Sequence, residues 1–165
     1  MPRNKEAVMN MKPSVVVCAL LGASLLFPPA GSCESPPKEK IVALVDKAAA
    51  LLEHDGEKAL AEFRKKDSVW FQGDTYIFVD DTAGKNLCHP ARPDLEGKSL
   101  LDMRDASGKL FVREMVDLIK SKDSGWVEYM WHKPGETKVA KKSSYIKKAK
   151  FGGKTCFVGC GVYLE

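Results

Sequence analysis

The sequence lacks the surplus of positive charge that nucleic-acid-binding proteins use to hold phosphates. Its 165 residues include 26 basic and 22 acidic side chains, of which the first 33 positions hold three basic and one acidic. The remainder therefore carries 23 basic and 21 acidic groups, a net charge of +2. A charge so near balance leaves no footprint for nucleic acid. The lysine-rich stretches 141–142 and 147–150 are typical of solvated strand edges, where lysine discourages pairing with other chains.

Internal repeats and low-complexity tracts are also absent, and cofactor ligands are few. Cys88-His89 resembles half of a haem-attachment signature, but Lys85 stands where the first cysteine should be. Cys88, His89, Cys156 and Cys160 are zinc-ligand types without the close pair on a turn that structural zinc sites use. We therefore expect no cofactor and no metal. A thiol- or metal-dependent redox role at Cys88-His89 is the least favoured alternative.

Cysteines are too few, and too awkwardly spaced, for a disulfide framework. Without the N-terminal segment three remain, and an odd number leaves at least one thiol unpaired. Cys156 and Cys160 share one face of a predicted strand about 13 Å apart at ~3.3 Å per residue, beyond the ~7 Å limit of a disulfide. One bridge from Cys88 to the last strand stays open. We expect all three to be small buried apolar residues.

The N-terminal segment has the three parts of a secretory signal. Arg3, Lys5 and Lys12 precede an apolar run at 15–27, and small residues follow at 30–32. The run is shorter than the ~20 residues of a typical membrane-spanning helix. We predict a signal peptide at 1–33, a linker at 34–37 and one domain at 38–165, placed in the periplasm or outside the cell. Cys33 sits where a lipoprotein cysteine would be lipidated. Ordinary cleavage and an uncleaved signal anchor are the alternatives.

The periodicity of residues 38–165 predicts an α+β fold. Apolar residues recur at helical spacing over 38–53, 57–66 and 109–122, with Asp55 as a candidate N-cap of the second helix. Aromatic and β-branched runs predict strands at 75–81, 86–89, 125–132, 139–147 and 155–164, with turns at Pro134-Gly135 and Gly152-Gly153. Helices segregated from strands in this way favour an antiparallel sheet.

Several motifs are similar to one family over residues 38–165. They include His89-Pro90, Leu95-Glu96-Gly97-Lys98, Gly125-Trp126-Val127-Glu128-Tyr129 and Val158-Gly159-x-Gly161. Together they resemble the single Cache domain (sCache_2-type). The resemblance implies a PAS-like five-stranded antiparallel sheet, with N-terminal helices on one face and a loop and helix over a pocket on the other. It also implies extracytoplasmic sensing in chemotaxis and signal transduction, with acetate, propionate, lactate or pyruvate as typical ligands, and no catalysis.

A buried carboxylate ligand needs charge-assisted hydrogen bonds to replace its lost hydration. Lys142 and Ser144 share one face of their predicted strand, as Tyr129 and Trp131 do on the neighbouring one. His89 lies just before the proline-rich loop and Arg92 lies on it, whereas Tyr145 points opposite Lys142 and ranks lower. The predicted ligand-binding residues are Lys142, Tyr129, Ser144, Trp131, His89, Tyr145, Trp126 and Arg92. The aromatic residues among them fit a core role equally well.

The sequence therefore predicts an extracytoplasmic binding module for a short carboxylate. The resemblance runs to Glu165, where a receptor would continue into a membrane helix. We accordingly expect a separate membrane partner, a receptor, kinase or transporter. A domain with a pocket filled by side chains, acting in structure or interaction at the membrane surface, is the alternative.

Overall fold

The computed structural model describes residues 36–164. The predicted signal peptide at 1–33, with Cys18 and Cys33, lies outside them. The described chain begins with helix α1 (Lys38–Asp55) and the short helix α2 (Glu57–Phe63). Gly56 separates the two helices with a φ of +56°, in the left-handed region that favours glycine. Ile41, Val45 and Leu52 of α1 are buried, so one face of this helix packs inward.

A five-stranded antiparallel sheet forms the centre of the domain. Its strands are β3 (Phe78–Asp81), β4 (Asn86–Cys88), β5 (Ser124–His132), β6 (Val139–Phe151) and β7 (Lys154–Leu164), in the spatial order β4-β3-β7-β6-β5. β5 and β6 form one hairpin, with His132 opposite Val139 next to the turn. β6 and β7 form the next, with Phe151 opposite Lys154. Both predicted hairpin turns are thus confirmed.

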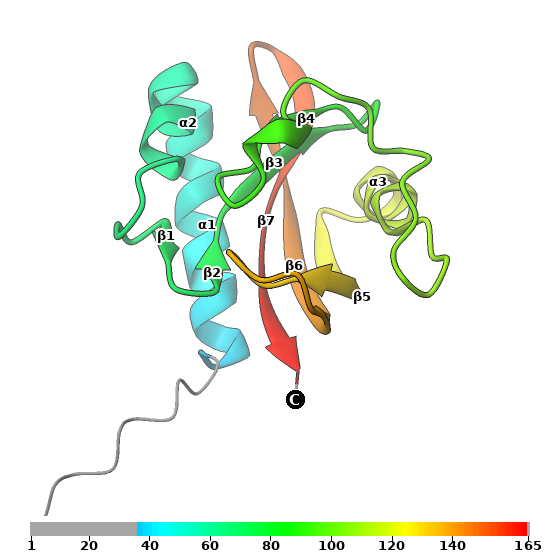
Figure 1. The fold of residues 1–165 in the computed structure, drawn as a ribbon. Helices are drawn as coiled ribbons and strands as arrows, with labels where there is room; N and C mark the ends of the chain where they lie inside the picture. The colour runs from blue at the N-terminus through cyan, green and yellow to red at the C-terminus, as the bar shows by residue number, and fades with distance from the viewer. Residues whose placement is uncertain (1–35, 165) are drawn as a thin grey trace, which may run out of the picture. The chain divides into compact units, whose positions relative to one another are not determined.

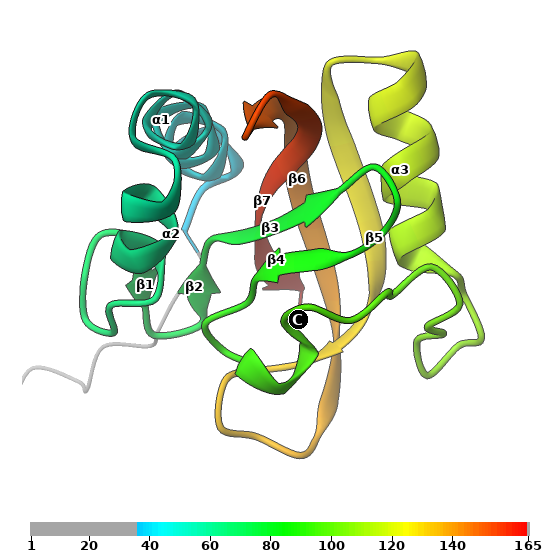
Figure 2. The same ribbon diagram turned by 90° about the horizontal axis from the view of Figure 1, so that it is seen from above.

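Helices cover both faces of this sheet (Figures 1 and 2). On one side, which we call the α1 face, lie α1 and α2. On the other, the α3 face, lie α3 (Phe111–Ser121) and a long loop containing the 3-10 turn Pro93–Leu95. Each face has its own buried core. The α1-face core contains Ile41, Leu52 and Val158, and the α3-face core contains Phe78, Met115 and Phe157. The predicted α+β, PAS-like architecture is confirmed.

Local details differ from the sequence prediction. Residues 75–81 are not one strand: β2 (Thr75–Tyr76) pairs with β1 (Phe71–Gln72) in a separate two-stranded sheet, and β3 starts at Phe78. The two-residue strand β1 is too short to give a periodic pattern. Asp55 ends α1 and is not the N-cap of α2, a position that Gly56 takes. The second helix ends at Phe63, and β6 continues to Phe151.

The cysteines behave as expected for small apolar residues. Cys88, Cys156 and Cys160 are free thiols, each 1% exposed or less. All three belong to the α1-face core. The bridge from Cys88 to the last strand, which the sequence left open, is not formed.

Candidate functional site

The most unusual buried group of the α3 face is the ammonium of Lys142. This residue lies on β6 opposite Tyr129 of β5 and Tyr163 of β7, and none of its surface is exposed. Its Nζ lies 3.8 Å from the ring centroid of Tyr76 and 5.1 Å from that of Tyr163, close enough for cation–π attraction. Nζ has no hydrogen-bond partner within residues 36–164. Burial lowers the pKa of Lys142 from 10.5 to about 7.

Glycine on β7 makes room for this lysine. A Cβ at Gly161 would lie 2.8 Å from Lys142 Cε and 2.3 Å from Ser144 Oγ. A Cβ at Gly159 would lie 2.2 Å from the Phe78 ring. Any side chain at either position would collide with these neighbours. The glycines therefore allow the lysine side chain and the Phe78 ring to lie flat across β7.

Four further predicted residues, Tyr129, Ser144, His89 and Trp131, lie on the same face. The Tyr129 hydroxyl is 3.0 Å from Ser144 Oγ, and the Tyr129 ring stacks on Phe111 at 4.5 Å. His89 is 6% exposed, and its Nδ1 has no hydrogen-bond partner among the described residues. Its ring is 5.8 Å from Trp131 and 5.1 Å from Tyr76. Burial, and then the nearby Lys142 charge, lower the pKa of His89 to about 3, which keeps it neutral.

A buried carboxyl group, Asp80, adds a second polar element that sequence reasoning missed. Asp80 is 2% exposed, and its Oδ1 accepts a hydrogen bond of 3.0 Å from Asn86 Nδ2. Burial raises its pKa to about 7, against a lowering by Asn86. Asp80 lines a small cavity whose other walls are Phe78, His89, Leu100, Phe111, Val112, Met115, Tyr129 and Trp131.

The cavity is nearly filled by its own side chains. Its free volume is about 20 Å³, which is roughly the space of one water molecule. The polar residues that line it are Asp80, His89 and Tyr129, whereas Lys142 and Ser144 lie on the same face of the sheet without lining it. A larger occupant would have to displace side chains or the loop that carries His89.

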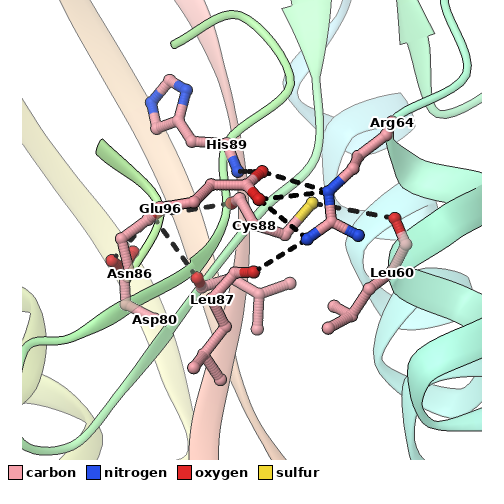
Figure 3. Close-up of polar contacts among 9 residues, drawn as sticks. Leu60, Arg64, Asp80, Asn86, Leu87, Cys88, His89 and Glu96 are labelled. Atoms are coloured by element: carbon pink, nitrogen blue, oxygen red, sulfur yellow. Dashed lines mark hydrogen bonds and ion pairs between the residues drawn. The ribbon is translucent and has the colours of Figure 1, made fainter. Parts of the chain in front are cut away.

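An ion pair fixes the start of that loop (Figure 3). Glu96 Oε1 accepts the backbone N–H of His89 at 2.8 Å. The two carboxylate oxygens accept from Arg64, which directly follows α2, through Nε at 3.1 and 3.2 Å and Nη2 at 2.8 Å. Arg64 Nη2 also donates to the carbonyl of Leu87 at 3.2 Å. The imidazole of His89 points away from the guanidinium, toward the α3-face core.

The structure does not bring all predicted site residues together. Trp126 and Tyr145 pack against the α1-face core, their rings 5.4 Å apart, on the opposite side of the sheet from Lys142. They are excluded from this site because adjacent residues of a strand face opposite ways. Arg92 is held by Asp94, with Nε and Nη2 each 2.8 Å from a carboxylate oxygen. It lines a surface cleft beside residues 132–137 and not the cavity.

The redox and metal alternatives at Cys88-His89 also lose their geometric basis. Cys88 belongs to the α1-face core, whereas His89 faces the α3 side, so the two cannot act on one ligand. Cys88 Sγ lies 3.9 Å from the carbonyl oxygen of Leu60. Burial raises the pKa of the Cys88 thiol to about 12, which suppresses the reactive thiolate.

Comparison with known proteins identifies the family. The Cache domain model (dCache_2) matches residues 41–165. The methyl-accepting chemotaxis protein McpP of Pseudomonas putida is 37% identical over 95 residues, which cover 58% of this chain and 17% of McpP. The sensor histidine kinase MctS of Rhizobium johnstonii is 26% identical over 166 residues, covering 100% of this chain and 30% of MctS. The chain thus spans less than a third of either relative.

Solved structures agree with this match. A Cache chemosensory domain studied for carboxylic acid recognition superposes with a TM-score of 0.67 at 30% identity, covering 78% of this chain and 93% of that domain. A periplasmic sensor domain of a chemotaxis protein gives 0.61 at 28% identity, covering 77% and 90%. A methyl-accepting chemotaxis protein from Vibrio parahaemolyticus shares the fold at 0.65 and 23% identity. No helix within residues 36–164 is long and apolar enough to cross a membrane.

Proposed function

Since the chain belongs to the Cache domain family, we propose that its α3 face binds a short organic anion of the acetate, propionate, lactate or pyruvate class. The observation that carries this proposal is the fully buried Lys142 ammonium, which has no ion-pair or hydrogen-bond partner within residues 36–164. A buried cation without a counter-charge costs free energy. A bound carboxylate would supply that charge. The related Cache domain that recognises carboxylic acids supports this choice of ligand class.

The remaining groups suit such a ligand in distinct ways. The neutral imidazole of His89 and the hydroxyls of Tyr129 and Ser144 offer hydrogen bonds. Phe111 and Trp131 form an apolar wall for a short alkyl chain. Because the free volume is about 20 Å³, binding includes a rearrangement of these side chains or of the His89 loop. Ligand affinity is then the contact energy minus the cost of opening the site.

A thermal-shift and calorimetric series with C2–C4 monocarboxylates tests this proposal. Lys142→Met should abolish the ligand-induced shift. Lys141→Met is the matched control, because Lys141 lies one residue away, is 54% exposed and pairs with Glu128 on the surface. An exposed pair of this kind contributes about 0–1 kcal/mol, so the control should respond to ligand like the wild type. A ligand-induced thermal shift that persists in Lys142→Met would show that Lys142 does not bind the anion.

The small cavity favours a second candidate, an interaction domain whose pocket is filled by side chains. In that case the aromatic rings around Lys142 are its permanent partners. No carboxylate would then stabilise the folded, ligand-free protein. The same thermal-shift series separates the two candidates.

The position of the domain in the cell is part of the proposal. We propose export through residues 1–33, attachment through a lipid on Cys33, and signalling through a membrane receptor, kinase or transporter. The chemotaxis and kinase relatives support such a partner. Mass spectrometry of the mature N-terminus, with Cys33→Ala as the control, tests the lipid. Cleavage that leaves an unmodified N-terminus would replace lipid attachment by a soluble exported protein.

A further inference from the structure

One carboxylate joins the candidate ligand site to the helical layer on the other side of the sheet. Glu96 accepts the His89 backbone N–H and, at the same time, two N–H groups of Arg64. His89 begins the loop over the α3 face, and Arg64 is the C-cap residue of α2. Arg64 and Glu96 lie 32 positions apart in the chain and come from different layers of the fold. No other ion pair within residues 36–164 also bonds to the backbone of a candidate site residue.

The geometry of this ion pair makes it stronger than a typical surface pair. Arg64 presents Nε and Nη2 to both oxygens of Glu96, and planar two-pronged pairing is both directional and favourable. The side chains are 40% and 22% exposed, so solvent screens the pair only in part. Burial tends to raise the pKa of Glu96, but the hydrogen bonds from Arg64 and the His89 N–H lower it on balance. Glu96 thus remains charged at neutral pH.

Each end of the pair is attached to a different buried core. The His89 ring contacts Tyr76, Phe78 and Trp131 of the α3-face core. Arg64 follows α2, whose Leu60 and Phe63 are buried in the α1-face core. Glu96 accepts from both the His89 N–H and Arg64, so a displacement of His89 moves the carboxylate that also binds Arg64 at the end of α2.

We propose that Glu96 is a positioning residue that sets the place of His89 in the ligand site and, through Arg64, couples occupation of that site to α2. This inference rests on the proposed function for its ligand-dependent part. The cavity has about 20 Å³ of free volume, so an incoming acid pushes on its walls, and His89 is the wall residue whose backbone N–H binds Glu96. Movement of the loop then reaches α2 through the Glu96–Arg64 pair.

Two substitutions of Glu96 separate its two contacts. Glu96→Gln keeps an oxygen that accepts the His89 N–H but loses the ion pair with Arg64. Glu96→Ala loses both. We expect lactate affinity, measured by calorimetry on the full chain, to fall about tenfold in Glu96→Ala, the equivalent of one lost hydrogen bond, and less than about threefold in Glu96→Gln. Asp94→Asn breaks a neighbouring ion pair of this loop, with Arg92, and serves as the control, with affinity unchanged.

Arg64→Ala tests the coupling separately from the positioning. Its affinity for lactate should stay within about threefold of wild type, while lactate should no longer change hydrogen–deuterium exchange of the α2 amides. Arg64→Lys retains charge without the two-pronged geometry and should restore the exchange response only in part. Lactate-dependent protection of α2 that is unchanged in Arg64→Ala would overturn the coupling.

A readout without ligand distinguishes failure of this inference from failure of the proposed function. The His89 ring resonances in ligand-free protein should shift in Glu96→Ala and stay close to wild type in Glu96→Gln and Asp94→Asn. Unchanged His89 resonances and unchanged lactate affinity in a folded Glu96→Ala protein would overturn the positioning role. If wild type binds no acid but His89 still shifts in Glu96→Ala, the positioning stands and the ligand proposal fails together with its coupling.

Discussion

The two faces of the central sheet use the same strands for opposite purposes. On the α1 face, β7 presents Cys156, Val158 and Cys160 to the apolar core beneath α1 and α2. On the α3 face, alternate positions of the same sheet bury Asp80, Lys142 and Ser144. Apolar burial stabilises a fold, whereas buried charge costs free energy and is retained where function requires it. Both faces have an apolar core, but the α3 face also buries Asp80 and Lys142, and it is this face that we propose binds a ligand.

The largest expected effect comes from breaking the apolar face. Leu52→Ala removes a side chain that is 1% exposed in the α1-face core and should cost about 2–5 kcal/mol of unfolding free energy. Urea denaturation measures the loss. The ligand-induced thermal shift should persist in this variant, because Leu52 has no contact with the α3 face. A lost ligand response in protein that is still folded would contradict the division between the faces.

Removing the buried cation should instead stabilise the ligand-free protein. Lys142→Met replaces an unpaired ammonium by a side chain of similar length, and should raise the ligand-free unfolding free energy by roughly 1–4 kcal/mol while abolishing anion binding. Destabilisation of this variant by a comparable amount would show that the lysine contributes to the fold.

The stability gained by Lys142→Met over wild type should also depend on pH. The pKa of Lys142 is about 7 in the folded protein and about 10.5 in the unfolded chain, because burial penalises the charged form. Between these values the unfolded chain binds more protons, and the stability of wild type rises with pH. The advantage of Lys142→Met should therefore shrink from pH 7 to pH 10. A constant difference across that range, by denaturation at each pH, would mean that burial does not lower the pKa of Lys142.

Ligand affinity should fall with pH above neutrality. In the ligand-free protein the Lys142 ammonium loses its proton above pH 7, and Asp80, with its pKa raised to about 7, becomes a carboxylate over the same range. Both changes disfavour an anion, by up to about tenfold per pH unit for the lysine alone. His89, with a pKa of about 3, contributes nothing here. Calorimetric titrations from pH 6 to pH 9 measure this slope, and affinity that rises with pH would contradict it.

The smallest expected effect comes from Arg92, which lies outside the candidate site. Arg92→Gln removes one side of an exposed ion pair with Asp94 and should change stability by less than about 0.5 kcal/mol. Carboxylate affinity should stay within about twofold of wild type. A larger loss of affinity would place Arg92 back in the ligand site, as its sequence position first indicated.

Much of the fold was predictable because its determinants are local. Helical and strand periodicity located α1, α3 and the three long strands. Strand alternation correctly placed Lys142 with Ser144 on one face of β6, and Tyr129 with Trp131 on one face of β5. Asp80 escaped prediction because its burial depends on Asn86, which pairs with it across an irregularity between β3 and β4. The Glu96–Arg64 pair joins residues that only the tertiary fold brings together, so no spacing in the sequence indicates it.

Titration of the Lys142 side chain by NMR tests the central claim most directly. With lysine labelled at Cε and the resonance assigned by its loss in Lys142→Met, the ligand-free protein should show a midpoint near pH 7. Saturating lactate should raise that midpoint by at least about one pH unit, because a bound carboxylate stabilises the ammonium. A midpoint that stays unchanged in lactate would contradict an anion site at Lys142.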